Sequence, residues 1–203
     1  MGTAPSAKAL LVTILGVLCA ACGQDSSPTG PSASTGPGLT LHAEINDPSG
    51  DARNSQPNPP DLIQAAVDVG SGSVTLEIVL AGGTFDPQAT RLYVAFDTDQ
   101  TAATGNAAWG IGTDYDAWVY AIDRSAEIRR RLPNDAPPVT VGMVSATVGA
   151  DRMNLIVPLS LPGGDDGRLD FQIHSSGDPR VAGQSAAILD FMPDLGLPPG
   201  RLQ

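Results

Sequence analysis

Four aspartates gather in one stretch of the sequence, in a pattern that could bind a metal ion. Asp97 and Asp99 are two residues apart, and Asp114 and Asp116 repeat that spacing after a loop rich in Gly, Ala and Thr. Residues i and i+2 of a β-strand point to the same side, so each pair presents two carboxylates together. Ca²⁺ takes roughly six to eight oxygen ligands, which two such pairs and loop carbonyls could supply. The stretch therefore predicts a calcium site, although it does not have the spacing of an EF-hand.

Two other interpretations of these aspartates stay open. Aspartate often stabilises turns, because its short carboxylate accepts hydrogen bonds from nearby backbone N–H groups. A glycosidase also needs a pair of carboxylates at a fixed distance, but an acid-rich surface offers many such pairs by chance. The sequence has no nucleophile elbow, no Gly-rich phosphate loop and no His/Cys zinc spacing, and its only histidines are His42 and His174. We therefore predict that the protein is not an enzyme.

The two tryptophans are the candidate ligand-binding aromatics. Trp109 lies in the Gly/Ala loop, where an exposed ring could stack on a sugar or fold back as a lid on the domain. Trp118 alternates with Asp116 and Tyr120 along a predicted strand, and it could equally pack in the core. Trp109 and Trp118 are predicted as ligand-binding residues, with these structural alternatives open.

Short apolar runs separated by turn residues must position these side chains. In the run 73–80, apolar residues alternate with Thr and Glu, which is the period of a half-buried strand. With 23 Gly and 18 Pro, and with Asp far more frequent than Glu, the composition favours turns over helices. The predicted strands are 39–45, 61–69, 73–80, 91–96, 117–122, 139–148, 153–161, 168–174 and 186–191. This pattern predicts an all-β fold, an antiparallel, jelly-roll-like β-sandwich of about nine strands.

Two segments of this pattern are less regular. The segment 123–131 is short and rich in arginine, and we interpret it as a strand with a turn. Pro158 lies inside the run 153–161 and predicts an edge strand or a bulge there, because proline cannot donate a ladder hydrogen bond.

The N-terminus predicts an export signal. Lys8 precedes an apolar run over 9–21 that is too short for a typical transmembrane helix. The residues from Cys19 to Cys22 resemble the lipobox of bacterial lipoproteins, which implies cleavage before Cys22 and lipidation of its thiol. Gly23 follows where a sorting aspartate would stand, and this implies the outer membrane, with the domain facing the periplasm or the cell surface. An ordinary cleaved signal with an incidental Cys22 is the alternative.

Three segments are therefore expected along the chain. Residues 1–21 form the lipoprotein signal peptide, and residues 22–38 form the lipidated cysteine and a flexible stalk of Ser, Thr, Pro and Gly. Residues 39–203 form a single β-sandwich domain. The net charge of −11 argues against binding nucleic acid, which needs basic surfaces. The expected partners are the membrane, through the lipid anchor, and a carbohydrate or an envelope protein.

Three segments carry a resemblance to a known group of domains. "NDPSGDA…PPDLIQAAV", "LYVAFDTDQTAATG…GIGTDYDAWV" and "LDFMPDLG" resemble family 9 carbohydrate-binding modules, glucodextranase C-terminal-like domains and DOMON-like domains. The resemblance implies a β-sandwich with a structural calcium held by acidic and carbonyl oxygens, and a sugar bound between aromatic side chains. The metal ligands it implies are Asp47, Asp51, Asp61, Asp97, Asp99 and Asp114, and the ligand-binding residues are Trp109 and Trp118.

The predicted function follows from these parts together. We expect a non-enzymatic envelope lipoprotein whose β-sandwich binds a ligand, with Ca²⁺ as a structural cofactor and a carbohydrate as the class of ligand that the resemblance implies. The alternative is a structural or protein-interaction module of the cell envelope with no small ligand.

Overall fold

The computed structural model describes most of the predicted domain. The described residues are 40–53, 59–107, 110–133, 136–184 and 186–203. The signal peptide, Cys22, the stalk and Trp109 lie outside them, so the predictions for those parts stay predictions.

The described part of the chain contains eleven strands and no helix, which confirms the predicted all-β fold. The strands are β1 (Leu41–Asn46), β2 (Leu62–Gly70), β3 (Ser73–Leu80), β4 (Thr90–Asp97), β5 (Tyr115–Tyr120), β6 (Ser125–Arg130), β7 (Val139–Val148), β8 (Arg152–Pro158), β9 (Asp170–Gly177), β10 (Ile188–Met192) and β11 (Gly200–Arg201). No helix that could span a membrane is found among these residues.

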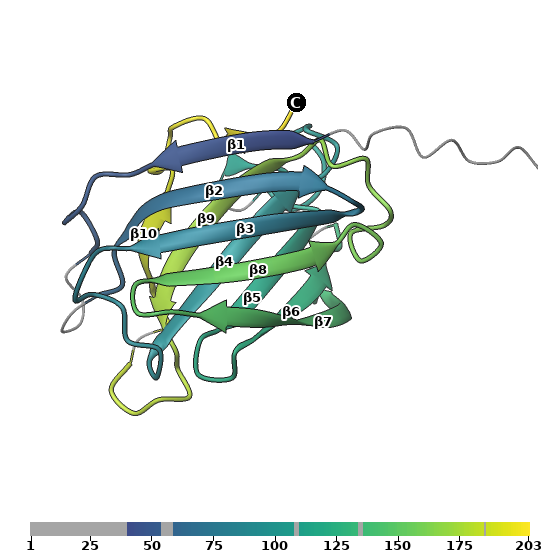
Figure 1. Ribbon diagram of the computed structural model, residues 1–203. Helices are drawn as coiled ribbons and strands as arrows, with labels where there is room; N and C mark the ends of the chain where they lie inside the picture. The colour runs from purple at the N-terminus through teal and green to yellow at the C-terminus, as the bar shows by residue number, and fades with distance from the viewer. Residues whose placement is uncertain (1–39, 54–58, 108–109, 134–135, 185) are drawn as a thin grey trace, which may run out of the picture. The chain divides into compact units, whose positions relative to one another are not determined.

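All strand pairs are antiparallel, and the sheet folds over on itself into two layers (Figure 1). The strand order is β1-β2-β3-β8-β7-β6-β5-β4-β9-β10, with β11 pairing β9. β7 belongs to both layers, because its residues Val139 to Ser145 pair β6 and its residues Ala146 to Val148 pair β8. The first layer is thus β1, β2, β3 and β8, and the second is β6, β5, β4, β9 and β10, as expected for a sandwich whose strands switch sheets at a corner.

The core lies between the two layers and is built from alternate residues of each strand. Leu76 and Ile78 of β3 are fully buried, and Val94 of β4 and Phe171 of β9 are buried with them. On β5, Ala117 and Val119 face this core. Because side chains alternate along a strand, Asp116, Trp118 and Tyr120 must lie on the opposite, outer face of the second layer.

Candidate functional site

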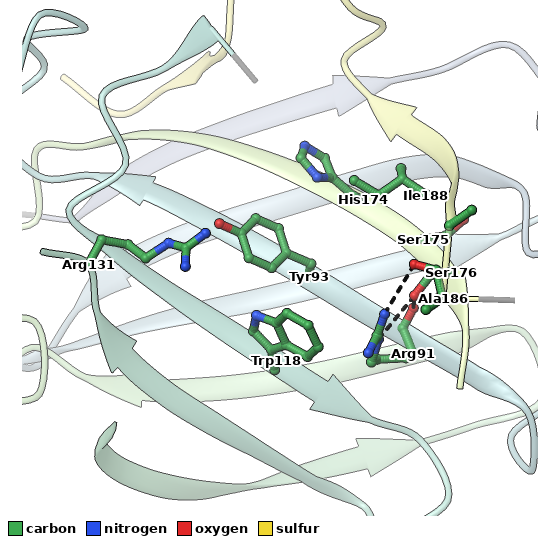
Figure 2. A pocket seen from close by; sticks show the side chains of 10 residues that line it. Arg91, Tyr93, Trp118, Arg131, His174, Ser175, Ser176, Ala186 and Ile188 are labelled. Carbon is green, nitrogen blue, oxygen red and sulfur yellow. Dashed lines mark hydrogen bonds between the residues drawn. The ribbon is translucent and has the colours of Figure 1, made fainter. Parts of the chain in front are cut away.

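A cleft of about 340 Å³ opens on the outer face of the second layer (Figure 2). The strand register places its central residues side by side, since Tyr93 of β4 lies opposite Trp118 of β5 and also opposite His174 of β9. The cleft is lined by Arg91, Tyr93, Trp118, Arg131, His174, Ser175, Ser176, Ala186, Ala187 and Ile188. Trp118 therefore lies in a ligand-sized cleft outside the core, as its predicted role requires.

The floor of the cleft is a row of aromatic rings that crosses the strands. Tyr93 stacks on His174 with ring centroids 5.2 Å apart, and it meets Trp118 edge to face at 6.0 Å. The row continues to Phe191 of β10, whose ring centroid is 4.7 Å from that of His174. Burial lowers the pKa of His174 to about 3 and raises the pKa of Tyr93 to about 12. At neutral pH the imidazole is therefore uncharged and the phenol keeps its proton.

Trp118 is flanked by two guanidinium groups. The guanidinium carbon of Arg91 lies 4.2 Å from the indole centroid, and that of Arg129 lies 4.3 Å from it. Arg91 belongs to β4 and Arg129 to β6, which are the strands on either side of β5, so the indole lies between them. Such cation–π contacts are favourable, but they also occupy ring surface on which a sugar could otherwise stack.

Asp116 is the counter-ion of the arginines on β6 and just beyond it. Its carboxylate is fully buried and accepts a hydrogen bond from Nε of Arg129 at 2.7 Å. Nε of Arg131 lies 2.9 Å from its other oxygen. Burial raises the pKa of Asp116, and the hydrogen bond and charge of Arg129 act against that rise. One carboxylate thus serves two guanidinium groups, which leaves this triad with a net positive charge.

Arg91 differs from these arginines because it has no acidic partner. Only 7% of the residue is exposed. Its Nε donates to the hydroxyl of Ser176 at 3.1 Å, and one terminal nitrogen donates to the carbonyl of Ala186 at 3.5 Å. No carboxylate of the described residues lies within ion-pair distance of it, and burial lowers its pKa. A buried cation without a counter-ion is unusual, since buried charges are normally paired.

A second candidate site lies beside β10, where five carboxylates meet. Asp47, Asp51 and Asp61 come from the early segment, and Asp190 and Asp194 join them from the C-terminal part. They form two overlapping groups that share Asp51, and the ligand oxygens within each group lie within 4.8 Å of one another. We call these five residues the early acidic cluster.

The carboxylates of the early acidic cluster lie close enough to repel one another. The pKa of Asp47 is raised to about 7 by burial and then by the charge of Asp190, and burial raises the pKa of Asp190 to about 6. Asp61 is 3% exposed, and one of its oxygens accepts bonds from the Gly50 amide and the Ser49 hydroxyl. Its other oxygen has no hydrogen-bond partner within the described chain. An orphaned buried oxygen among repelling carboxylates fits a hard cation such as Ca²⁺.

The middle aspartates form a separate group with different surroundings. Oxygens of Asp97, Asp99 and Asp114 also lie within 4.8 Å of one another. These oxygens accept hydrogen bonds from the loop: the Thr101 amide bonds both Asp97 and Asp99, and the Thr104 hydroxyl bonds Asp99. Burial raises the pKa of Asp97 to about 6, and the Thr104 hydrogen bond lowers that of Asp99. Such hydrogen bonds are typical of aspartates that stabilise a turn, which was the alternative interpretation of these residues.

The two acidic groups are too far apart to share one ion. Asp97 lies opposite Asp170 on β9, and Asp190 lies opposite Ser175, five residues farther along the same strand. At about 3.4 Å per residue the separation along the strand is roughly 17 Å. The six predicted ligands therefore divide three and three, and Asp190 and Asp194 are added to the first group. The signal for both was present in the sequence segment "LDFMPDLG", which contains them.

Comparison with known proteins does not assign this site. No family model matches the sequence, and no curated protein matches it significantly.

Proposed function

We propose that this protein is a non-enzymatic lipoprotein of the cell envelope whose β-sandwich binds a carbohydrate in the cleft beside Trp118. The observation that carries the proposal is the cleft itself. Its volume of about 340 Å³ suits a small ligand, since such sites usually measure about 300–1,000 Å³. It combines aromatic rings with the guanidinium donors of Arg91 and Arg131. The lipid anchor and envelope location rest on the sequence of residues 1–38 alone.

The lining of the cleft supports binding rather than hydrolysis. A glycosidase places two carboxylates around the scissile bond, but no Asp or Glu is among the described residues that line this cleft. The nearby Asp116 is fully buried and held by Arg129 and Arg131. Burial keeps His174 neutral, and its Nε2 lies 3.1 Å from the amide oxygen of Gln172, which carries no charge.

Tryptophan fluorescence tests the proposed ligand site. In a Trp109→Phe variant, Trp118 is the only tryptophan, so quenching or a spectral shift on adding oligosaccharides reports on the cleft. We expect this variant to keep the response and Trp118→Phe to lose it. A response that persists in Trp118→Phe and disappears in Trp109→Phe would assign the sugar to Trp109 and contradict a site at Trp118. If no saccharide of a broad panel binds either variant or the wild type, carbohydrate binding is wrong.

We propose further that the early acidic cluster holds a structural Ca²⁺. The ion would join the loop of Asp47 and Asp51 to Asp61, which precedes β2, and to Asp190 in β10. Burial raises the pKa of Asp47 most, and the neighbouring carboxylates raise it further; a cation there would remove this repulsion. It would stabilise the fold by mass action, because the unfolded chain does not preserve the site.

Thermal unfolding in EDTA and in millimolar Ca²⁺ tests this proposal. We expect Ca²⁺ to raise the Tm of the wild type and of Asp99→Asn, but not that of Asp61→Asn. The reverse pattern, with the shift lost only in Asp99→Asn, would assign the ion to the middle aspartates. An unchanged Tm in all three proteins would rule out a structural calcium.

A further inference from the structure

Arg91 lines the cleft without an ion pair to any carboxylate of the described residues. The charge of Asp178 acts on Arg91, but that carboxylate is bound by the guanidinium of Arg180 through 2.9 and 3.0 Å hydrogen bonds, and Arg180 also pairs with Asp123. The partners of Arg91 are the neutral Ser176 hydroxyl, the Ala186 carbonyl and the face of Trp118. A guanidinium has five N–H donors, so these contacts leave donors for a ligand in the cleft that it lines.

The carboxylates near the cleft lie outside its described lining and are held by other groups. Asp116 is shared by Arg129 and Arg131, which leaves that triad positive. Glu127 lies opposite Trp118 on β6, where it accepts a hydrogen bond from the Thr140 hydroxyl, and it is not among the lining residues. The described lining thus contains two arginines and no acid, in a chain whose net charge is −11.

We propose that the cleft binds a saccharide that carries a carboxylate, such as a uronate, with the carboxylate bound by Arg91. This inference rests on the proposed function and narrows its ligand class. A planar guanidinium pairs with a carboxylate through two parallel hydrogen bonds, which are stronger than bonds between neutral groups. The guanidinium of Arg131 lies across the cleft from Arg91, with Trp118 between them, where it can bind the sugar hydroxyls (Figure 2).

The surroundings of Trp118 favour an acidic sugar over a neutral one. A neutral sugar is usually recognised by stacking on an exposed aromatic face, but the Trp118 indole lies between Arg91 and Arg129. Stacking would displace a guanidinium and expose its charge in a half-buried site. A carboxylate, by contrast, can bind Arg91 while the cation–π contact stays in place.

Paired ligands test the charge of the ligand directly. Oligomers of galacturonate, glucuronate and mannuronate would each be titrated calorimetrically beside their neutral methyl esters, using the mature protein. We expect at least one acid to bind about tenfold or more tightly than its ester, and its affinity to fall between 50 and 500 mM NaCl, because salt screens the charge pair. In Arg91→Gln the acid should lose this advantage, while ester binding should change little.

Control variants separate the role of Arg91 from folding and from net charge. Arg168→Gln makes the same change of charge at an exposed arginine that pairs with Asp166 outside the cleft, and it should bind like the wild type. Arg91→Lys keeps the charge but loses the planar guanidinium. We therefore expect its affinity for the acidic saccharide to lie between the affinities of the wild type and of Arg91→Gln. If Arg91→Gln does not fold, Arg91→Lys and the salt series of the wild type still decide the question.

The outcomes distinguish this inference from the proposed function. Equal affinity for acids and esters, unchanged by salt or by Arg91→Lys, would overturn the acidic ligand while carbohydrate binding stands. If no acid and no ester binds, the acidic ligand is overturned; if the broad saccharide panel also gives no binding, both proposals fail.

Discussion

The buried carboxylate of Asp116 shows how one residue organises the arginine side of the cleft. It is fully buried and contacts the Nε atoms of both Arg129 and Arg131. Asp116→Asn would leave two guanidinium groups beside each other without a counter-ion. We expect this change to lower the free energy of unfolding by about 3–5 kcal/mol, measured by urea denaturation, because breaking a buried pair leaves an uncompensated charge.

The matched control for Asp116 is an aspartate of an exposed pair. Asp166 lies 3.0 Å from Arg168, and both side chains are more than half exposed. Asp166→Asn should therefore leave the urea midpoint almost unchanged. If Asp116→Asn is as mild as Asp166→Asn, the arginine triad does not stabilise the domain.

The raised pKa of Asp47 predicts a pH dependence of the metal-free protein. Its folded pKa of about 7 lies above the ordinary aspartate pKa of 3.8, so the folded state holds this proton more tightly than the unfolded state does. The stabilisation is full below about pH 4 and is lost as the pH rises toward 7. In EDTA we expect the urea midpoint to fall over this range in the wild type and to fall less in Asp47→Asn.

A different aspartate provides the control for the pH series. The backbone amide of Arg168 lowers the pKa of Asp166, so this residue contributes to stability in the opposite direction. Asp166→Asn should not reduce the fall of the urea midpoint between pH 4 and 7. An Asp47→Asn protein with the same slope as the wild type would show that Asp47 ionises freely in the folded state.

The identity of the site residues was only partly predictable from sequence. Spacing identified Asp97 and Asp99 because their geometry is local to one strand end. Asp190 belongs to the early acidic cluster only because β10 lies beside the start of β2, where its carboxylate accepts a 2.6 Å bond from the Leu62 amide. The role of Arg91 depends on its having no ion pair with a carboxylate of the described residues, and spacing along the chain cannot show that.

At the scale of elements, the alternation of apolar and polar residues predicted most strands correctly. The segment 123–131 forms β6 in spite of its arginines, because Arg129 faces outward to Asp116 and Ile128 fills the core. The predicted edge at Pro158 is local to that residue, which is paired on one side only, by Ser73 of β3. β8 is paired on both sides, and Pro158 is its last residue, beyond the part that β7 pairs. β11 has two residues, which is too short for a periodic signal.

The short strand β11 depends on a glycine that lets two strands and a core ring meet. Gly200 lies opposite Phe171 of β9, and a Cβ atom at this position would lie 2.5 Å from Cδ1 of Ile45 and closer still to the Phe171 ring. We expect Gly200→Ala to lower the free energy of unfolding by about 1–3 kcal/mol through overpacking. Gly82→Ala is the control, since open space surrounds Gly82, and it should be neutral. A neutral Gly200→Ala would mean that the C-terminal strand moves away at little cost.

At the scale of the whole domain, β10 connects the cleft to the early acidic cluster. Ile188 at one end of this strand lines the cleft, and Asp190, two residues later, belongs to the cluster. Phe191 then packs on His174 in the cleft floor and lies under the guanidinium of Arg53, whose backbone amide bonds the Leu189 carbonyl at 2.6 Å. A cation bound by Asp51 and Asp190 would therefore hold the strand that forms one wall of the cleft.

This connection predicts that Ca²⁺ and the saccharide bind cooperatively. If the ion fixes β10, the ligand has less of the cleft wall to order, so its affinity should be about fivefold or more higher in Ca²⁺ than in EDTA. Linkage requires the ligand to raise the affinity for Ca²⁺ by the same factor. Phe191→Leu leaves the carboxylates and Arg91 in place but weakens the contact with His174. It should reduce the effect of Ca²⁺ on saccharide affinity and the effect of the saccharide on Ca²⁺ affinity by the same factor. Identical ligand affinities in Ca²⁺ and EDTA would show that the two sites share a strand without sharing free energy.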